Sequence, residues 1–174
     1  MNHFKYLFVC TILVFLASNL YAESVLKIGT QVPVQLTLDA SSKKMSEPPT
    51  AIVAEDILTD DGKLAIKRGT SVSLYFGGDR ARAMGAPGFF TLRFEATRTV
   101  KNMKVNLDCE NIVRKGKDKH GLSIGLGTTG FLIWPLLPCY LIKGKNVEIP
   151  AGTTFYNVFV AEDVVIPDYY YINN

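Results

Sequence analysis

Apolar and polar residues alternate along much of the chain between residues 23 and 120. Val32, Val34, Leu36 and Leu38 alternate with other residues, and the same period of two runs through residues 103–107. In residues 90–97 the apolar positions end at Ala96, and the positions from Thr91 to Thr97 are polar. Because successive side chains of a strand point to opposite faces, each run predicts a half-buried antiparallel strand. No helical periodicity competes with this pattern, so we expect an all-β domain.

Turn residues separate the predicted strands. Asp60-Asp61-Gly62 follows one apolar run and precedes the next, which is a strong hairpin signal. Lys101-Asn102 separates two alternating runs by two residues and predicts a second hairpin. The glycine-rich residues 77–88 predict a long loop that projects from the rim of the domain.

Three segments share one pattern, in which a short strand ends, a glycine follows and a threonine opens the next strand. Glycine suits this place because it adopts positive φ without a Cβ clash. Residues 51–57 and 158–164 also resemble each other through a shared Val-Ala-Glu-Asp. These repeats predict a single antiparallel β-barrel or sandwich with similar Gly-Thr corners at both ends. The corner glycines are Gly29, Gly69 and Gly152.

The first 22 residues have the layout of a secretory signal peptide. Lys5 precedes an uncharged apolar run over residues 7–16, and the segment ends at the small residue Ala22. The alternative is an uncleaved N-terminal anchor. We therefore expect an exported chain, in which residues 1–22 are removed and residues 23–174 form one β-barrel domain.

Residues 122–142 contain no charged side chain, and basic residues flank them on both sides. Pro135, Pro138 and three glycines argue against one regular helix. We treat residues 113–145 as an insertion, and three interpretations stay open. The apolar segment is a plug over the barrel, a loop that enters a bilayer, or a partner-binding arm. The residues expected to contact a membrane or partner are Arg114, Lys115, Lys117, Lys119, Phe131, Leu132, Ile133, Trp134, Leu136, Leu137, Lys143 and Lys145.

Candidate chemistry is sparse in the rest of the chain. Cys109 and Cys139 bracket the apolar segment, and in an exported protein they either form a disulfide or remain two buried thiols. His120 lies in a charged loop, and no spacing of ligands predicts a metal site or a cofactor site. With a net charge of +3 over 174 residues, nucleic-acid binding is not expected either. We therefore expect a protein that is not an enzyme and needs no cofactor.

The order of these motifs resembles the C-terminal β-barrel domain of TrbI-type proteins, which are conjugal-transfer and type IV secretion subunits of an outer-membrane core complex. The matching residues are 26–36, 51–61, 65–70, 92–94, 103–107 and 159–164. The chain also looks like small stand-alone exported bacterial β-barrel proteins with the Ile-Pro-Ala-Gly-Thr corner. In the TrbI family an insertion between late strands reaches the outer membrane, and residues 122–142 occupy the corresponding interval.

Together these features predict an exported structural or interaction protein of the cell envelope, in the periplasm or associated with the outer membrane. Its expected partners are other envelope proteins, further copies of itself or the outer-membrane surface. The competing hypothesis is a non-enzymatic periplasmic binding module, in which a small ligand enters the barrel mouth near residues 77–88.

Overall fold

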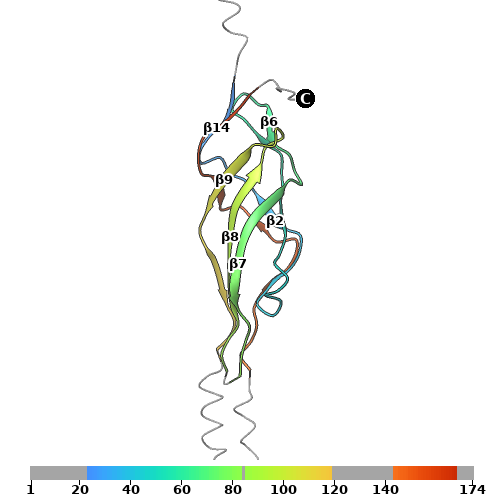
Figure 1. The fold of residues 1–174 in the computed structure, drawn as a ribbon, viewed down its shortest axis with the longest axis vertical. Helices are drawn as coiled ribbons and strands as arrows, with labels where there is room; N and C mark the ends of the chain where they lie inside the picture. Colours follow the sequence, from blue (N-terminus) through green and yellow to red (C-terminus); the bar gives the residue numbers. More distant parts are fainter. Residues whose placement is uncertain (1–22, 84, 119–142, 168–174) are drawn as a thin grey trace, which may run out of the picture.

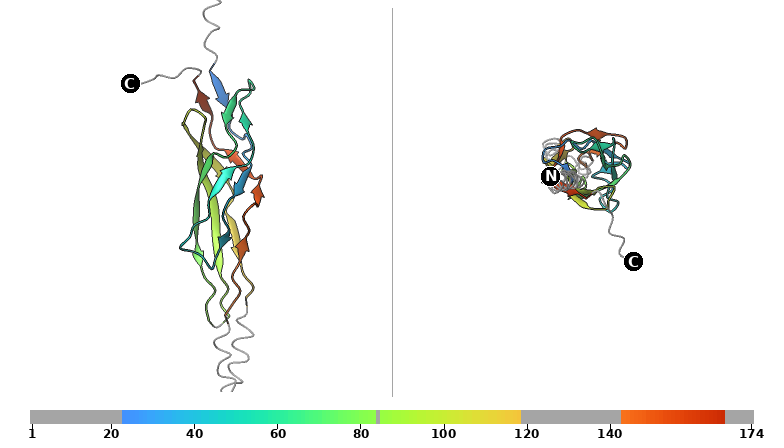
Figure 2. Two further views of the ribbon diagram at one scale, coloured as in Figure 1. Left: turned by 90° about the vertical axis from the view of Figure 1, so that its right-hand side faces the viewer. Right: turned by 90° about the horizontal axis from the view of Figure 1, so that it is seen from above.

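The computed structural model describes residues 23–83, 85–118 and 143–167 of the chain. These residues form an elongated β-structure (Figures 1 and 2). The first strand, β1 (Ser24–Leu26), and the last, β14 (Val164–Ile166), lie together at one end. The long hairpin of β7 (Ser71–Asp79) and β8 (Phe89–Arg98) reaches the other end, where the chain passes into residues 119–142.

Ten further strands complete the described part of the chain. They are β2 (Val34–Leu36), β3 (Ala40–Ser41), β4 (Ala51–Val53), β5 (Ile57–Leu58), β6 (Leu64–Ile66), β9 (Lys104–Cys109), β10 (Ile112–Lys115), β11 (Glu148–Ile149), β12 (Thr154–Phe155) and β13 (Val158–Val160).

One antiparallel sheet dominates the structure and nearly closes on itself. Its strand order is β12-β2-β4-β7-β8-β9-β13, and β10 pairs with β8 outside this path. The segment just before β2 crosses to β13, because the Val32 amide donates to the Val158 carbonyl and the Val160 amide donates to the Thr30 carbonyl, both at 2.9 Å. No helix occurs among the described residues. The predicted all-β fold, a single antiparallel barrel with Gly-Thr corners, is therefore confirmed.

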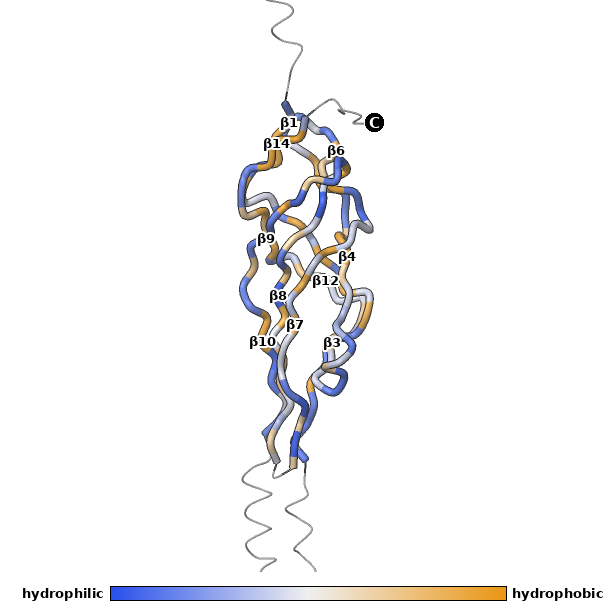
Figure 3. The backbone as a smooth tube through the Cα atoms, in the orientation of Figure 1, coloured by the Kyte–Doolittle hydropathy of each residue, from blue (hydrophilic) through white to orange (hydrophobic). Residues whose placement is uncertain are grey.

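The predicted alternation places the core correctly in most strands. Phe90, Leu92 and Phe94 on β8 are completely buried, as are Val34 on β2 and Val105 on β9. Figure 3 shows apolar and polar positions alternating along these strands.

Two positions depart from the predicted alternation. Leu38 is 56% exposed, because β2 ends at Leu36 and the chain turns toward Asp39. Thr97 is 3% exposed although the pattern placed it outside. The register between β7 and β8 shifts between Ser73 and Leu74, which leaves Glu95 as the extra residue of a β-bulge and reverses the faces beyond it.

Both predicted hairpins are present. Gly62 has a φ of 76°, and the Thr59 amide donates to the Lys63 carbonyl to connect β5 with β6. Asn102 has a φ of 61°, and the Thr99 amide donates to the Met103 carbonyl between β8 and β9. Asparagine tolerates this left-handed conformation better than most residues.

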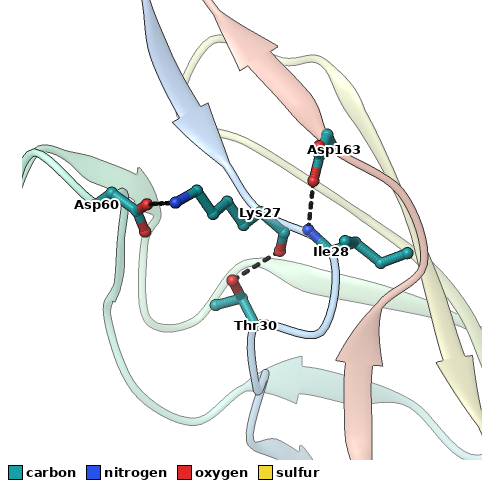
Figure 4. A network of polar contacts seen from close by, with 5 residues as sticks. All are labelled: Lys27, Ile28, Thr30, Asp60 and Asp163. Carbon is teal, nitrogen blue, oxygen red and sulfur yellow. Dashed lines mark hydrogen bonds and ion pairs between the residues drawn. The ribbon is translucent and has the colours of Figure 1, made fainter.

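The first Gly-Thr corner shows how these turns are built (Figure 4). Gly29 has a φ of 78°, and both the amide and the hydroxyl of Thr30 donate to the Lys27 carbonyl, the hydroxyl at 2.7 Å. The Lys27 side chain also reaches Asp60 of the β5–β6 hairpin. The hydrogen bond and the charge of Asp60 raise the pKa of Lys27, but both groups are exposed, so this ion pair adds little stability.

An aspartate from another strand completes the same corner. The Ile28 amide donates to a carboxylate oxygen of Asp163 at 2.7 Å, and the Gly29 amide donates to the Val160 carbonyl at 2.9 Å. Asp163 thus follows the last residue of β13 by three positions. Its carboxylate accepts an amide that has no strand partner where the chain turns.

The other two corners repeat this arrangement in every respect. In each, a strand ends three residues before an aspartate, the glycine has positive φ, and the amide before the glycine donates to the aspartate at 2.6–2.8 Å. Each corner also joins the main sheet to a two-stranded ribbon, β1–β14, β5–β6 or β3–β11. The sets of strand end, aspartate, amide donor, glycine and threonine are Val160, Asp163, Ile28, Gly29 and Thr30; Val53, Asp56, Arg68, Gly69 and Thr70; and Leu36, Asp39, Ala151, Gly152 and Thr153.

The barrel therefore contains three copies of one unit. The Val-Ala-Glu-Asp repeat revealed two of them in the sequence. The third was missed because Asp39 follows Leu36-Thr37-Leu38, which shares only the spacing of the aspartate.

Because each aspartate accepts a corner amide, Asp39→Ala, Asp56→Ala and Asp163→Ala should lower the free energy of unfolding by similar amounts, about 1 kcal/mol each. The matching Asn variants retain an acceptor oxygen and should lose less. Glu55→Ala changes an exposed carboxylate beside Asp56 and serves as the control. Urea unfolding measures these differences, and three alanine variants as stable as the Glu55 control would contradict the role of the aspartates.

Candidate functional site

Three segments meet where the barrel gives way to residues 119–142. We call residues 80–88, 115–118 and 143–147 together the insertion base, of which residue 84 lies outside the described residues. The Gly116 amide donates to the Gly88 carbonyl at 2.8 Å, and the Gly88 amide donates to the Lys145 carbonyl at 3.0 Å. The Gly144 amide reaches the Arg82 carbonyl at 3.3 Å. Both ends of the insertion are therefore hydrogen-bonded to the β7–β8 loop.

Glycines permit this close approach of three backbones. A Cβ atom on Gly116 would lie 1.9 Å from the Lys145 carbonyl oxygen, and one on Gly144 would lie 2.2 Å from the Ala86 carbonyl oxygen. Both distances are impossible for a real side chain. The glycine-rich composition near residues 77–88 therefore serves packing within the insertion base, where we had expected a projecting loop.

The third corner unit connects the insertion base to the barrel. Ser42, directly after β3, donates its amide to the Val147 carbonyl, and the Val147 amide donates to the Ser42 hydroxyl at 3.0 Å. The Asn146 side chain accepts the Ala81 amide at 2.9 Å and contacts the Ser42 hydroxyl at 3.2 Å. The loop, the returning chain and the β3–β11 ribbon are therefore hydrogen-bonded together.

The insertion base is strongly basic. Its segments contain six basic residues and one acidic residue, Asp118, whereas the whole chain has a net charge of only +3. The remainder of the chain therefore carries a net negative charge. Arg82 forms an exposed ion pair with Asp79 at 3.0 Å. The six basic residues, all exposed, are Arg80, Arg82, Lys115, Lys117, Lys143 and Lys145.

The sequence predicted four of these basic residues but separated them from the other two. Lys115, Lys117, Lys143 and Lys145 were recognised as flanks of the apolar segment. Arg80 and Arg82 were placed in a separate loop, since nothing local in the sequence shows that the loop pairs with the flanks.

Arg114 differs from the other predicted contact residues. It pairs with the buried Phe90 in the β10–β8 register, which places it on the interior face of the sheet at an exposed position. The remaining predicted contact residues lie outside the described residues, as does His120. These predicted contacts are Lys119, Phe131, Leu132, Ile133, Trp134, Leu136 and Leu137.

Cys109 takes part in the sheet through its side chain. Its sulfur accepts the Phe94 amide at 3.3 Å and lies 3.5 Å from the Phe94 carbonyl oxygen, where β8 changes partner from β9 to β10. Burial raises the pKa of the Cys109 thiol, so it is mostly protonated at neutral pH. Cys139 lies outside the described residues, so the disulfide between Cys109 and Cys139 stays a prediction.

The described residues contain no cluster of three or more side chains suited to a metal ion. In the same ranges, no helix is long and apolar enough to cross a membrane. A hollow of about 330 Å³ lies on the side of the barrel, between residues 109–112 and 154–158. It is not at residues 77–88, where the binding-module hypothesis expected the ligand.

Comparison with known proteins gives a structural match. No protein-family model matches the chain, and no curated protein matches it. Its structure is similar to that of ComB10 of the Com Type IV secretion system of Helicobacter pylori, with a TM-score of 0.45 and 15% sequence identity. The match covers 85% of this chain and 93% of ComB10. The sequence resemblance and the structural match thus both name type IV secretion proteins. At this similarity the match assigns no role to individual residues.

Because Gly116 has no space for a Cβ atom, Gly116→Ala should separate the insertion base while leaving the barrel core folded. Amide hydrogen exchange should speed up at Gly88 and Lys145 by about tenfold or more, with little change at Leu92 or Val105. Lys115→Ala at the adjacent exposed position is the control. Unchanged exchange at Gly88 in the Gly116 variant would show that the close backbone contact is absent.

Proposed function

We propose that this chain is an exported structural protein of the cell envelope, which attaches to an anionic membrane surface through its apolar insertion and basic insertion base. The observation that carries the proposal is the position of the six basic side chains. They surround the two points at which the uncharged segment 122–142 leaves and rejoins the barrel.

The physical basis is the pairing of charge with apolar surface. Lysine and arginine near an anionic bilayer contribute about 1 kcal/mol each to binding. An uncharged segment such as residues 122–142 gains free energy when it leaves water, whether it enters lipid or an apolar partner. Placed together, the two contributions favour a membrane surface over bulk solvent.

The insertion base also supports the proposal through its hydrogen bonds. The Lys145 amide donates to the Lys117 carbonyl at 3.3 Å, so the two ends of the insertion stay adjacent. The barrel remains complete on the other side of this contact. Such a construction lets the insertion leave the barrel without exposing its core.

The resemblance to TrbI-type proteins supports a role beside other envelope proteins. In that family the corresponding interval reaches the outer membrane. We therefore extend the proposal to a component of, or a relative of, a conjugation or type IV secretion complex. Export by the signal peptide of residues 1–22 belongs to the same proposal.

Replacing Lys115, Lys117, Lys143 and Lys145 by Gln should weaken binding to vesicles that contain anionic lipid by about tenfold or more. The matched control replaces Lys63, Lys67, Lys101 and Lys104, which lie toward the opposite end, and has the same net charge. Vesicle co-sedimentation at low and high salt measures the difference. Equal losses in the two variants would contradict a localised membrane contact.

Replacing residues 119–142 by a short Gly-Ser linker should leave a folded barrel that no longer sediments with vesicles or with the envelope fraction. The adjacent ends at Lys117 and Lys145 make such a short connection feasible. Circular dichroism and thermal unfolding check the fold. Loss of folding would favour the plug interpretation of the segment, and retained vesicle binding would contradict its role in attachment.

A further inference from the structure

The β10 strand has one paired edge and one open edge. The Gly116 amide donates to Gly88, and ladder bonds recur every second residue, so Arg114 and Ile112 also bond toward β8. The backbone groups of Val113 and Lys115 therefore point away from β8. Within the described residues, no strand pairs with this edge of β10.

The opening has defined ends. On one side the Lys145 amide bonds to Lys117, and on the other Cys109 pairs with Val158 of β13. Between these points the returning chain turns away, because β11 pairs with β3 and β12 pairs with β2. We call the gap between β10 and residues 147–158 the seam.

A hollow lies at the Cys109 end of the seam. It measures about 330 Å³ and is bordered by both sides of the gap. Ile112, Phe155 and Val158 supply its apolar lining, and Asn111, Thr154 and Asn157 supply polar groups. Phe155 stacks against the core residue Phe94 with ring centroids 5.3 Å apart, so the hollow lies close to the barrel core.

Arg114 is the charged group on the interior side of the seam. Its register partner Phe90 is completely buried, yet Arg114 itself is exposed and forms no ion pair among the described residues. Ile112, two residues earlier, has the buried partner Leu92 and lines the hollow. An apolar site and an unpaired guanidinium group therefore lie two residues apart on one face of β10.

We propose that the seam binds an extended segment of another envelope protein by strand addition to β10. The bound segment carries an apolar side chain and an acidic side chain two positions apart. Backbone hydrogen bonds to Val113 and Lys115 supply affinity, while the hollow and Arg114 select the side chains. The acidic residue is required because a strand covering Arg114 would otherwise remove a charge from water without a counter-ion.

The test uses the full chain and the peptide acetyl-Thr-Ile-Thr-Asp-Thr-Ile-Thr-amide. Isoleucine stands on both sides of the aspartate, so the peptide fits β10 in either direction. We expect saturable shifts of the Val113 and Lys115 amide signals by NMR and slower hydrogen exchange at both. A peptide with Lys in place of Asp should bind about tenfold more weakly or worse.

A charge exchange separates specific pairing from general attraction. With Arg114→Glu the preference should reverse in favour of the Lys peptide, whereas Arg93→Glu on the outer face of β8 should keep the Asp preference. A peptide N-methylated at alternate amides should not bind. Failure of the Asp peptide to bind, or the same preference in the Arg114 and Arg93 variants, would overturn the proposal. Either result would leave Arg114 as a charge that only prevents pairing at an open edge.

Discussion

The barrel depends on three aspartate carboxylates, each of which accepts an amide where the chain turns out of the main sheet. At these corners the glycine adopts positive φ and the threonine caps the turn, but neither provides an acceptor for the preceding amide. Asp39, Asp56 and Asp163 provide it from another strand. A buried or strained amide without a partner would cost free energy, so these contacts allow short strands to change direction without losing hydrogen bonds.

The same unit serves different purposes at the two ends of the molecule. At one end two corners lead into the ribbons β1–β14 and β5–β6, close to the first and last described strands. The third corner leads into β3–β11, and Ser42 beside it bonds to the chain returning from the insertion. The hydrogen-bonded frame of the barrel thus continues into the insertion base. A load on the insertion would pass to the sheet through backbone contacts.

Much of the fold was predictable, because alternation and turn residues are local signals. The β8 and β9 core positions and the two hairpins follow from them directly. The errors at Leu38 and Thr97 have long-range causes, since one depends on where a corner forms and the other on a bulge at Glu95. The insertion base was predicted only in part for the same reason. Arg80 and Arg82 lie more than 30 residues before the flanking lysines, and only backbone pairing brings them together.

The open seam and the insertion base follow from one geometric conflict. The returning chain pairs beside residue 117 at Lys145, but β11 and β12 must then join β3 and β2 to complete the third corner unit. This strand therefore cannot also cover β10. The corner unit that anchors the insertion is thus the reason that the barrel is incomplete beside it. Closing the seam within the chain would require breaking the β11–β3 or β12–β2 pairing, so a strand from another protein can fill it without that loss.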